Sequence, residues 1–465
     1  MLNDDVQVFR ELMMNITFLG ATGTVTGSKY LLSFDDQNIL IDCGLFQGYK
    51  ELRLRNWGAL PFDPAMLDAV ILTHAHIDHT GYLPLLVKNG FTGPIYCTRG
   101  TKDLCGILLP DSAHIQEEDT RHANEHHYSK HDPALPLYTI QDAERALTLF
   151  KPQAYHSVIQ LNKNTHFQLI PAGHIIGSSF VHIENQDTSL LFTGDLGRMR
   201  DSVMQTPTVV QQVDYLVTES TYGDRLHEKA HPKIVLKNII NKTIHRGGSV
   251  IIPAFAVGRS QAILHYLAEL KKENAIPQIP IYLDSPMAIN ATHILCQHIE
   301  DLRLTKTECE ALSEAATYIQ TVEDSIELDR HKTPKVIISS SGMVTGGRVL
   351  FHLKAYASDA RNTILFTGYQ APGTRGADIL DGANYIKMHG RMTAIHAEVD
   401  AIRSTSAHAD YEEMLEWLGH FKQPPKKTFI THGEPESALS LKHKIESKLG
   451  WSCIIPQYKQ TEQLS

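Results

Sequence analysis

The sequence predicts an α/β protein of two domains, and three features of the 465-residue chain lead to that prediction. The histidine-rich stretch Thr73–His79, which reads THAHIDH, directly follows the apolar run Val70–Leu72. Open α/β sheets place their ligands at such carboxyl ends of strands. Residues 225–400 alternate short β-branched runs with amphipathic helical patterns, which is typical of a parallel sheet. The length also exceeds what one small core needs and favours two domains.

Composition excludes several classes of protein. No stretch approaches 18 consecutive apolar residues, so we expect no membrane-spanning helix. The net charge of −9 excludes a generally basic surface for nucleic acid. The first 13 residues are acidic and mixed, do not resemble a secretory signal, and are expected to form a loosely held extension. The six cysteines contain no C-x-x-C pair, so we expect reduced thiols and a cytoplasmic protein.

The N-terminal region, residues 15–46, predicts two or three strands, which read ITFLG, KYLLSF and NILIDCG. The glycines of the intervening GATGTVTG permit tight turns. Asp42 ends the third strand, where it could be an ordinary turn residue or a carboxylate that orients metal-binding histidines.

The stretch THAHIDH carries four potential metal ligands, His74, His76, Asp78 and His79. In an extended segment alternate side chains share a face, and a turn at Asp78 would add His79 to that face. Imidazole and carboxylate groups together suit zinc, iron or manganese and argue against calcium. A histidine-rich surface loop is the alternative, but H-x-H-x-D-H after an apolar strand is a more specific pattern than a lone histidine pair.

Residues 100–150 predict a mostly helical, polar region that contains a second group of histidines. A helix would place His122 and His126 on one face, but no strand supports the group and two prolines follow it. We therefore interpret it as solvated surface. The members of this group are His114, His122, His126, His127 and His131.

Three single residues farther along the chain, His174, Asp195 and His432, each end a predicted strand. Alone, each would be an ordinary turn residue, but with THAHIDH they complete a set for two metals that could share a hydroxide nucleophile. The predicted sets are His74, His76 and His174 for one metal, Asp78, His79 and His432 for the other, and Asp195 as the bridge.

These motifs, in this order and strand context, resemble the metallo-β-lactamase superfamily, and more narrowly its β-CASP branch of nucleic-acid-processing hydrolases. Three further motifs mark that branch, and the chain carries them as Glu219 in YLVTE, His408 in TSAHAD and His432 in KTFITHGEP. The resemblance is closest to the cleavage-and-polyadenylation endonuclease subunit and its bacterial and archaeal homologues. It implies an αββα sandwich formed by residues 1–224 and 401–465, with a parallel-sheet β-CASP domain inserted at 225–400.

The resemblance also implies roles for particular residues. Asp42 would orient a metal-binding histidine, and two zinc ions, with manganese or iron as alternatives, would activate a hydroxide for in-line attack on phosphorus. Asp78 would take part in catalysis as a ligand. His408 would protonate the leaving 3′-oxygen, and Glu219 would fix its tautomer and raise its pKa.

Three loops of the insert contain glycine and look suited to phosphates: 255–259, 339–348 and 370–376. The second also has hydroxyl groups and, like the first, leads from a predicted strand into a predicted helix. Such loops can present backbone N–H groups to phosphate, although ordinary βα turns look the same. No aromatic-rich basic stripe accompanies them, so sequence-specific readout is not expected. The candidate phosphate contacts are Arg259, Ser341, Gly342, Arg348, Gln370, Thr374 and Arg375.

The expected substrate is single-stranded RNA, because in this branch a histidine at the third motif, here His432, accompanies RNA. We expect endonuclease action, because the longer members known as 5′-exonucleases have a further C-terminal domain. The alternatives are a 5′-exoribonuclease, a small-molecule thioesterase or lactonase, and a non-catalytic RNA scaffold. A membrane is not an expected partner. The sequence is compatible with a homodimer but does not give the oligomeric state.

Overall fold

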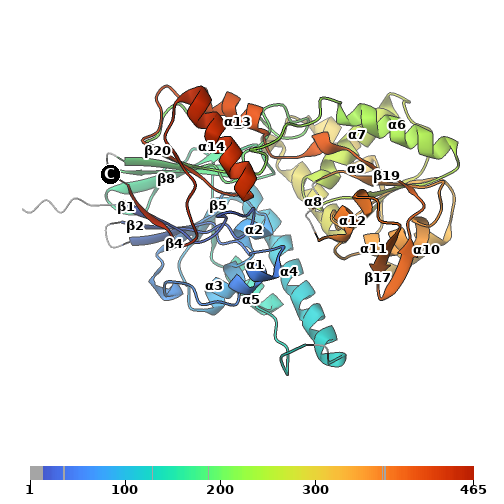
Figure 1. Cartoon of the computed structure of the whole chain (residues 1–465), viewed down its shortest axis with the longest axis horizontal. Helices are drawn as coiled ribbons and strands as arrows, with labels where there is room; N and C mark the ends of the chain where they lie inside the picture. The colour runs from blue at the N-terminus through green and yellow to red at the C-terminus, as the bar shows by residue number, and fades with distance from the viewer. Residues whose placement is uncertain are drawn as a thin grey trace, which may run out of the picture.

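The structure, a computed structural model, describes residues 14–34, 37–127, 129–186, 188–368, 370 and 373–464. The predicted N-terminal extension, residues 1–13, lies outside these described residues. The described chain forms two lobes that lie side by side (Figure 1). None of its helices is long and apolar enough to cross a bilayer.

The first lobe contains two sheets that pack face to face. Over the described residues each sheet has seven strands. The first, in spatial order, consists of β22 (Thr461–Leu464), β1 (Met14–Phe18), β2 (Tyr30–Phe34), β3 (Gln37–Ile41), β4 (Ala69–Ile71), β5 (Ile95–Thr98) and β6 (Phe150–Gln153). The second consists of β21 (Cys453–Ile454), β20 (Lys427–Ile430), β11 (Tyr215–Thr218), β10 (Thr188–Phe192), β9 (Ser179–Asn185), β8 (Thr165–Pro171) and β7 (Ile159–Gln160).

The two sheets share one apolar core, in which Leu32 and Ile71 of the first sheet pack with Phe167, Phe192 and Phe429 of the second. Helices cover the two outer faces, so the layers run helix, sheet, sheet, helix from top to bottom (Figure 1). The helices on the first sheet's side are α1 (Lys50–Arg55), α2 (Ile77–Thr80), α3 (Leu83–Lys88), α4 (Arg99–Glu125) and α5 (Ile140–Leu147). Those on the second sheet's side are α13 (Tyr411–Leu418) and α14 (Pro435–Leu449). The predicted αββα sandwich is confirmed.

The second lobe is built on a parallel sheet. Its strands β12, β15 and β16 read VIIP, VIIS and TILF and are buried along their whole length, because helices cover both faces of the sheet. In spatial order the sheet contains β14 (Thr317–Tyr318), β13 (Ile281–Asp284), β15 (Val336–Ser339), β12 (Val250–Pro253), β16 (Thr363–Phe366) and β19 (Glu398–Ala401). A separate hairpin joins β17 (Tyr385–Met388) and β18 (Arg391–Ala394).

The helices of the second lobe divide between the two faces of this sheet. On one side lie α6 (Pro232–His245), α7 (Arg259–Lys272), α8 (Pro286–Gln297) and α9 (Lys306–Glu314). On the other lie α10 (Val322–Arg330), α11 (Val349–Tyr356) and α12 (Arg375–Leu380). The predicted inserted parallel-sheet α/β domain is confirmed.

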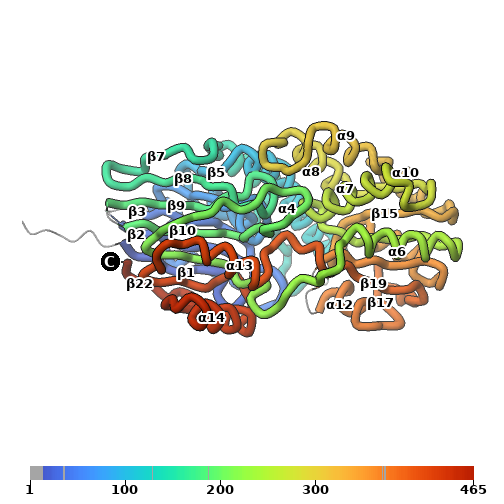
Figure 2. Tube along the Cα trace, turned by 90° about the horizontal axis from the view of Figure 1, so that it is seen from above, coloured from blue at the N-terminus to red at the C-terminus, as the bar shows by residue number. Residues whose placement is uncertain are grey.

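The chain leaves the first lobe after β11 and returns to it before β20, which pairs with β11 in parallel. Figure 2 shows the last segment, in red, back among the first strands. The limits 1–224, 225–400 and 401–465 are our proposal for the domains of the chain. Strand β19, which pairs with β16 of the insert, ends at Ala401.

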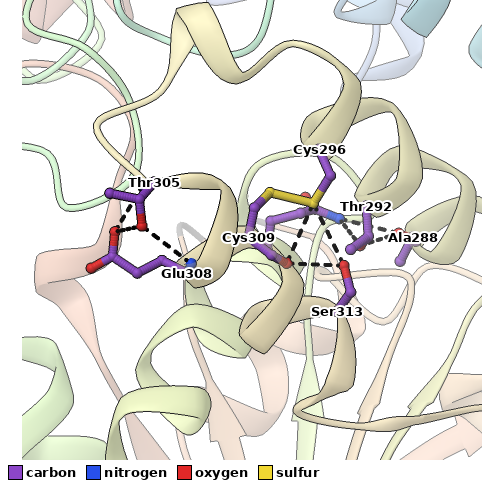
Figure 3. Close-up of a disulfide and its surroundings, with 8 residues drawn as sticks. Ala288, Thr292, Cys296, Thr305, Glu308, Cys309 and Ser313 are labelled. Carbon is purple, nitrogen blue, oxygen red and sulfur yellow. Dashed lines mark hydrogen bonds between the residues drawn. A yellow bond between two sulfur atoms is a disulfide. The ribbon is translucent and has the colours of Figure 1, made fainter.

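A disulfide joins Cys296 in α8 to Cys309 in α9 (Figure 3). The expectation that all six cysteines are reduced is therefore wrong for this pair, whereas the other four are free and buried. The spacing of 13 residues carries no recognisable pattern, and the pairing arises because the end of α8 meets the start of α9. The disulfide closes a segment that contains the short helix Ile299–Asp301 and contacts the first lobe.

Candidate dinuclear metal centre

The predicted metal ligands converge at one edge of the sandwich, where strands of both sheets end. His74 and His76 follow β4, and Asp78 and His79 lie in the first residues of α2. The remaining predicted ligands follow strands of the second sheet: His174 after β8, Asp195 after β10 and His432 after β20. The structure therefore brings all seven together.

One group of ligand atoms is formed by three histidines and one carboxylate. The Nδ1 atom of His76 lies 3.1 Å from His74 Nε2 and 3.2 Å from His174 Nε2. The Oδ2 atom of Asp195 lies 3.3 Å from His74 Nε2 and 3.4 Å from His174 Nε2. Four potential ligand atoms thus surround one point.

A second group lies on the other side of the same carboxylate. The Nε2 atoms of His79 and His432 are 3.2 Å apart, and Asp78 Oδ2 lies 3.3 Å from His432 Nε2 and 3.8 Å from His79 Nε2. The Oδ1 atom of Asp195 lies 3.3 Å from His79 Nε2. Asp195 therefore directs one oxygen to each group, as a bridging ligand would.

These separations fit divalent cations. Ligand atoms arranged tetrahedrally around zinc at its usual bond lengths lie about 3.3 Å from one another. The buried Oδ1 of Asp195 accepts no hydrogen bond within the described part of the chain, and its polar neighbours include His79 Nε2 at 3.3 Å and His432 Nδ1 at 3.5 Å. A cation would satisfy this oxygen together with the imidazole nitrogens. Both groups are therefore suited to hold a metal ion.

Asp42, which follows β3, contacts residues of this centre on the side away from the ligand atoms. Its Oδ2 accepts a hydrogen bond from His79 Nδ1 at 2.7 Å, and its two oxygens accept from the Thr73 backbone and hydroxyl at 2.8 Å. Burial lowers the pKa of His79, but the carboxylates of Asp195 and Asp42 raise it well above its usual value. The local field therefore favours positive charge.

His408 lies beside both ligand groups, with its ring centroid 4.6 Å from that of His174. Its Nδ1 is 3.1 Å from each carboxylate oxygen of Glu219, which is buried at the end of β11. Burial lowers the pKa of His408, but Glu219 and Asp195 raise it to about 9. The ring is thus held in one orientation, and the two carboxylates favour its protonated form.

Sequence reasoning missed three side chains that hold this arrangement. The Thr221 hydroxyl contacts His432 Nδ1 at 3.1 Å, and His227 Nε2 donates a hydrogen bond to the backbone carbonyl of His408 at 2.9 Å. The third is Thr73, which bonds to Asp42. The first residue of THAHIDH and the Ser-Thr-Tyr-Gly that follows Glu219 were the available signals.

The three candidate phosphate loops converge at the carboxyl ends of β12, β15 and β16. Gln370 Nε2 donates to the carbonyls of Gly342 and Gly368, which ties two of the loops together. The Ser341 hydroxyl lies 3.0 Å from the Thr345 hydroxyl, and Thr374 caps α12 by accepting from Ala377 N.

The three candidate arginines of these loops differ in their partners. Arg348 donates to the Asp284 carboxylate at 2.6 Å, and Arg375 donates to the backbone carbonyls of Val344 and Lys387. Arg259 makes no side-chain hydrogen bond or ion pair within the described residues, and its Nε is buried. Of the three, Arg259 is therefore the one available to a ligand.

The histidines interpreted as solvated surface lie on or after α4. His122 and His126 are exposed, and their rings stack with centroids 6.1 Å apart. With the exposed Glu125 they form a third group of potential ligands, far along α4 from the strand ends.

A sandwich of two sheets with convergent histidines and aspartates at its edge defines a metallo-hydrolase fold. Three family profiles match the chain: the "Metallo-beta-lactamase superfamily" at residues 22–234, the "Beta-Casp domain" at 260–379 and the "Zn-dependent metallo-hydrolase RNA specificity domain" at 393–456. The chain belongs to the metallo-β-lactamase superfamily and, within it, to the β-CASP family of metal-dependent hydrolases.

Named relatives match nearly the whole chain. Ribonuclease TTHA0252 of Thermus thermophilus is 35% identical over 438 residues, which cover 92% of this chain and 95% of that protein. The transcription termination factor FttA of Methanosarcina mazei is 33% identical over 464 residues, covering 95% of this chain and 70% of that protein. A crystal structure of a protein of unknown function from Enterococcus faecalis V583 shares the fold, with a TM-score of 0.55 at 13% identity over 97% of this chain and 100% of that one.

Proposed function

We propose that the chain is a zinc-dependent ribonuclease that hydrolyses internal phosphodiester bonds of single-stranded RNA. The observation that carries this proposal is the position of His408, held by Glu219 beside two ligand groups that share Asp195. A thioesterase or lactonase of the same fold has no use for a proton donor held at the boundary with a large inserted lobe. The similarity to a named ribonuclease over 95% of that protein's length supports RNA as the substrate.

We propose specific residues for each metal. One zinc ion would be held by His74, His76 and His174, and the other by Asp78, His79 and His432, with one oxygen of Asp195 on each. Two such cations would supply a nucleophile from water at neutral pH and stabilise the charge that develops on phosphorus. The histidine-rich shells favour zinc over manganese and iron.

His408 would supply the proton for the leaving 3′-oxygen. Glu219 accepts from Nδ1–H, so Nε2–H is the donor that remains for the substrate. The same carboxylate keeps the imidazole protonated, and general acid catalysis of this kind contributes roughly 10²–10⁴-fold to a rate. Asp42 would keep the ring of His79 in place through its 2.7 Å hydrogen bond.

Covalently closed circular RNA tests the endonuclease proposal directly, because a 5′-exonuclease has no end to start from. We expect the purified protein to linearise the circle and then shorten it, while matched circular DNA stays intact. Asp78→Asn should remove the activity. Cleavage of only linear RNA, with release of 5′ mononucleotides, would establish the 5′-exonuclease alternative, and hydrolysis of a thioester without any RNA cleavage would refute the nuclease.

Three finer points are predictions for solution measurements. Elemental analysis of protein purified without chelator should give two zinc ions per chain. Light scattering distinguishes a homodimer, which the sequence allows, from a monomer. Fractionation of source cells should place the protein in the cytoplasm.

A further inference from the structure

Arg259 carries a charge that the proposed mechanism does not use. It is the first residue of α7, and its Nε is buried without a partner among the described residues. Burial lowers the pKa of Arg259 to about 10, which leaves the guanidinium charged at neutral pH. Arg259 makes no ion pair within the described residues, although the Asp201 carboxylate lines the same cavity and favours its charge. The planar guanidinium matches phosphate geometry, so an anionic ligand fits here.

Phe255, four residues earlier, is an aromatic side chain with 37% of its surface exposed. Its ring rests on glycine backbone. A Cβ at Gly342 would lie 2.8 Å from Phe255 Cδ2, and one at Gly368 would lie 3.4 Å from Phe255 Cε2 and 3.6 Å from Arg259 Nε. The edge of the ring and the guanidinium therefore both lie near Gly368. The Phe255 side chain is at the same time partly exposed, so a ligand can reach it.

A cavity between the two lobes connects Arg259, the charged member of this pair, to the metal centre. It has a volume of about 40 Å³. His174 and Ala407 of the first lobe line it, as do Val257 and Arg259 of the second. Because His174 is a proposed metal ligand and Ala407 precedes His408, a polymer cleaved at the centre would extend past Arg259.

We propose that Phe255 and Arg259 form a nucleotide subsite, in which the ring stacks on one base of single-stranded RNA near the cleaved bond and the guanidinium pairs with an adjacent phosphate. This subsite rests on the proposed function, because it would hold the RNA that the ribonuclease cleaves. Stacking needs only the flat face of a base, so the subsite would accept any sequence. The sequence has no aromatic-rich basic stripe, and a subsite with one stacking ring needs none.

Cleavage of RNAs that carry one abasic ribose at successive positions tests the subsite. For the wild-type protein we expect one position at which loss of the base raises KM about 10-fold with little change in kcat, since aromatic stacking typically contributes this much per base. Phe255→Ala should raise KM for intact RNA by a similar factor. The abasic change at that one position should then have no further effect, and Phe255→Tyr should restore the wild-type pattern.

Further variants separate this role from a structural one. Phe255→Leu keeps apolar bulk over the glycines but lacks the flat face, and should behave as Phe255→Ala does. Phe351→Ala removes an exposed ring from α11 and should leave KM unchanged. Arg259→Ala should reduce the slope of log Kd against log salt by about 0.7, the value for one phosphate of a single strand.

Additive effects of Phe255→Ala and the abasic change at every position would overturn the subsite, as would an unchanged KM for both Phe255→Ala and Phe255→Leu. These outcomes leave the proposed ribonuclease intact, because they are measured on a wild-type protein that cleaves RNA. A wild-type protein that cleaves no RNA would overturn the proposed function and the subsite together.

Discussion

Asp195 and Asp42 show how single carboxylates organise the centre. Asp195 directs one oxygen to each ligand group, so its substitution would disturb both metals at once. Asp42 lies one step farther out and binds His79 through the nitrogen that does not face the ligand group. Positioning of this kind fixes the tautomer of a metal-binding histidine and raises its basicity.

Asp42→Asn should therefore weaken metal binding without removing a ligand. We expect the affinity for zinc to fall about 10- to 100-fold, the usual effect of losing such a partner. Competition with a chromogenic chelator measures the affinity. An unchanged affinity would contradict the positioning role.

Glu219→Gln should change the pH dependence of cleavage through His408. The carboxylate raises the pKa of His408, and its loss should lower that pKa. A general acid must be protonated, so activity falls as pH rises through its pKa. In Glu219→Gln the falling limb of log kcat should therefore move to lower pH. Metal content should stay at the wild-type level. A limb that stays in place would show that another group titrates.

At the level of elements, the segment between Cys296 and Cys309 connects the lobes. Its Asp301 carboxylate accepts a hydrogen bond from Gly177 N at 2.7 Å, three residues after the proposed ligand His174. Its His298 contacts Asp103 of α4 at 2.8 Å. The disulfide joins the two ends of this segment, Cys296 and Cys309.

Loss of the disulfide should lower the stability of the protein. Closing a loop of this size stabilises the fold by about 3 kcal/mol in the chain-entropy account, so Cys296→Ser with Cys309→Ser should reduce the free energy of unfolding by about that amount. Denaturant unfolding measures it. Reductant should lower the stability of the wild type and leave the double variant unaffected, and equal stabilities would contradict the prediction.

Helix α11 carries His352, which is fully buried between two carboxylates. Its Nε2 lies 2.9 Å from Asp284 Oδ2, and its Nδ1 lies 2.7 Å from Asp329 Oδ1. Burial lowers the pKa of His352, but the hydrogen bonds to both carboxylates raise it above its usual value. A raised pKa in the folded state adds stability that is complete below the unfolded pKa of about 6.5 and is lost as pH rises through the folded pKa.

His352→Asn should therefore cost the most stability at low pH. We expect the free energies of unfolding of wild type and variant to differ by about 1.5–3 kcal/mol near pH 6, the range for hydrogen bonds to charged groups, and to approach each other as pH rises. Urea unfolding at several pH values measures the difference. A difference that is constant or grows with pH would contradict the charged state.

For the whole molecule, local patterns predicted one part of the fold and the family resemblance the other. Apolar β-branched runs followed by glycine-rich loops predicted the parallel sheet of the insert, whereas the αββα sandwich followed from the resemblance that the motifs carry. The position of His408 against Glu219 depends on the return of the chain from the insert, 189 residues later, and only the family resemblance indicated it.

Other features had no local signal. Arg348 contacts Asp284 at the end of β13, and Arg375 contacts the carbonyl of Val344 in the neighbouring loop. Neither partner is adjacent in sequence, so a glycine-rich loop with an arginine looked the same in all three cases. The disulfide depends on how α8 meets α9. Such features follow from packing, which residue spacing does not encode.

The most direct test of the proposed mechanism uses an RNA in which sulfur replaces the bridging 3′-oxygen at the cleaved bond. A thiolate leaves without being protonated, so the proposed acid should become dispensable. We predict that His408→Ala cleaves ordinary RNA roughly 10²–10⁴-fold more slowly than the wild type. With two zinc ions still bound, it should cleave the sulfur-substituted RNA at nearly the wild-type rate. A variant that stays slow on that substrate, or that has lost metal, would contradict the role of His408 as proton donor.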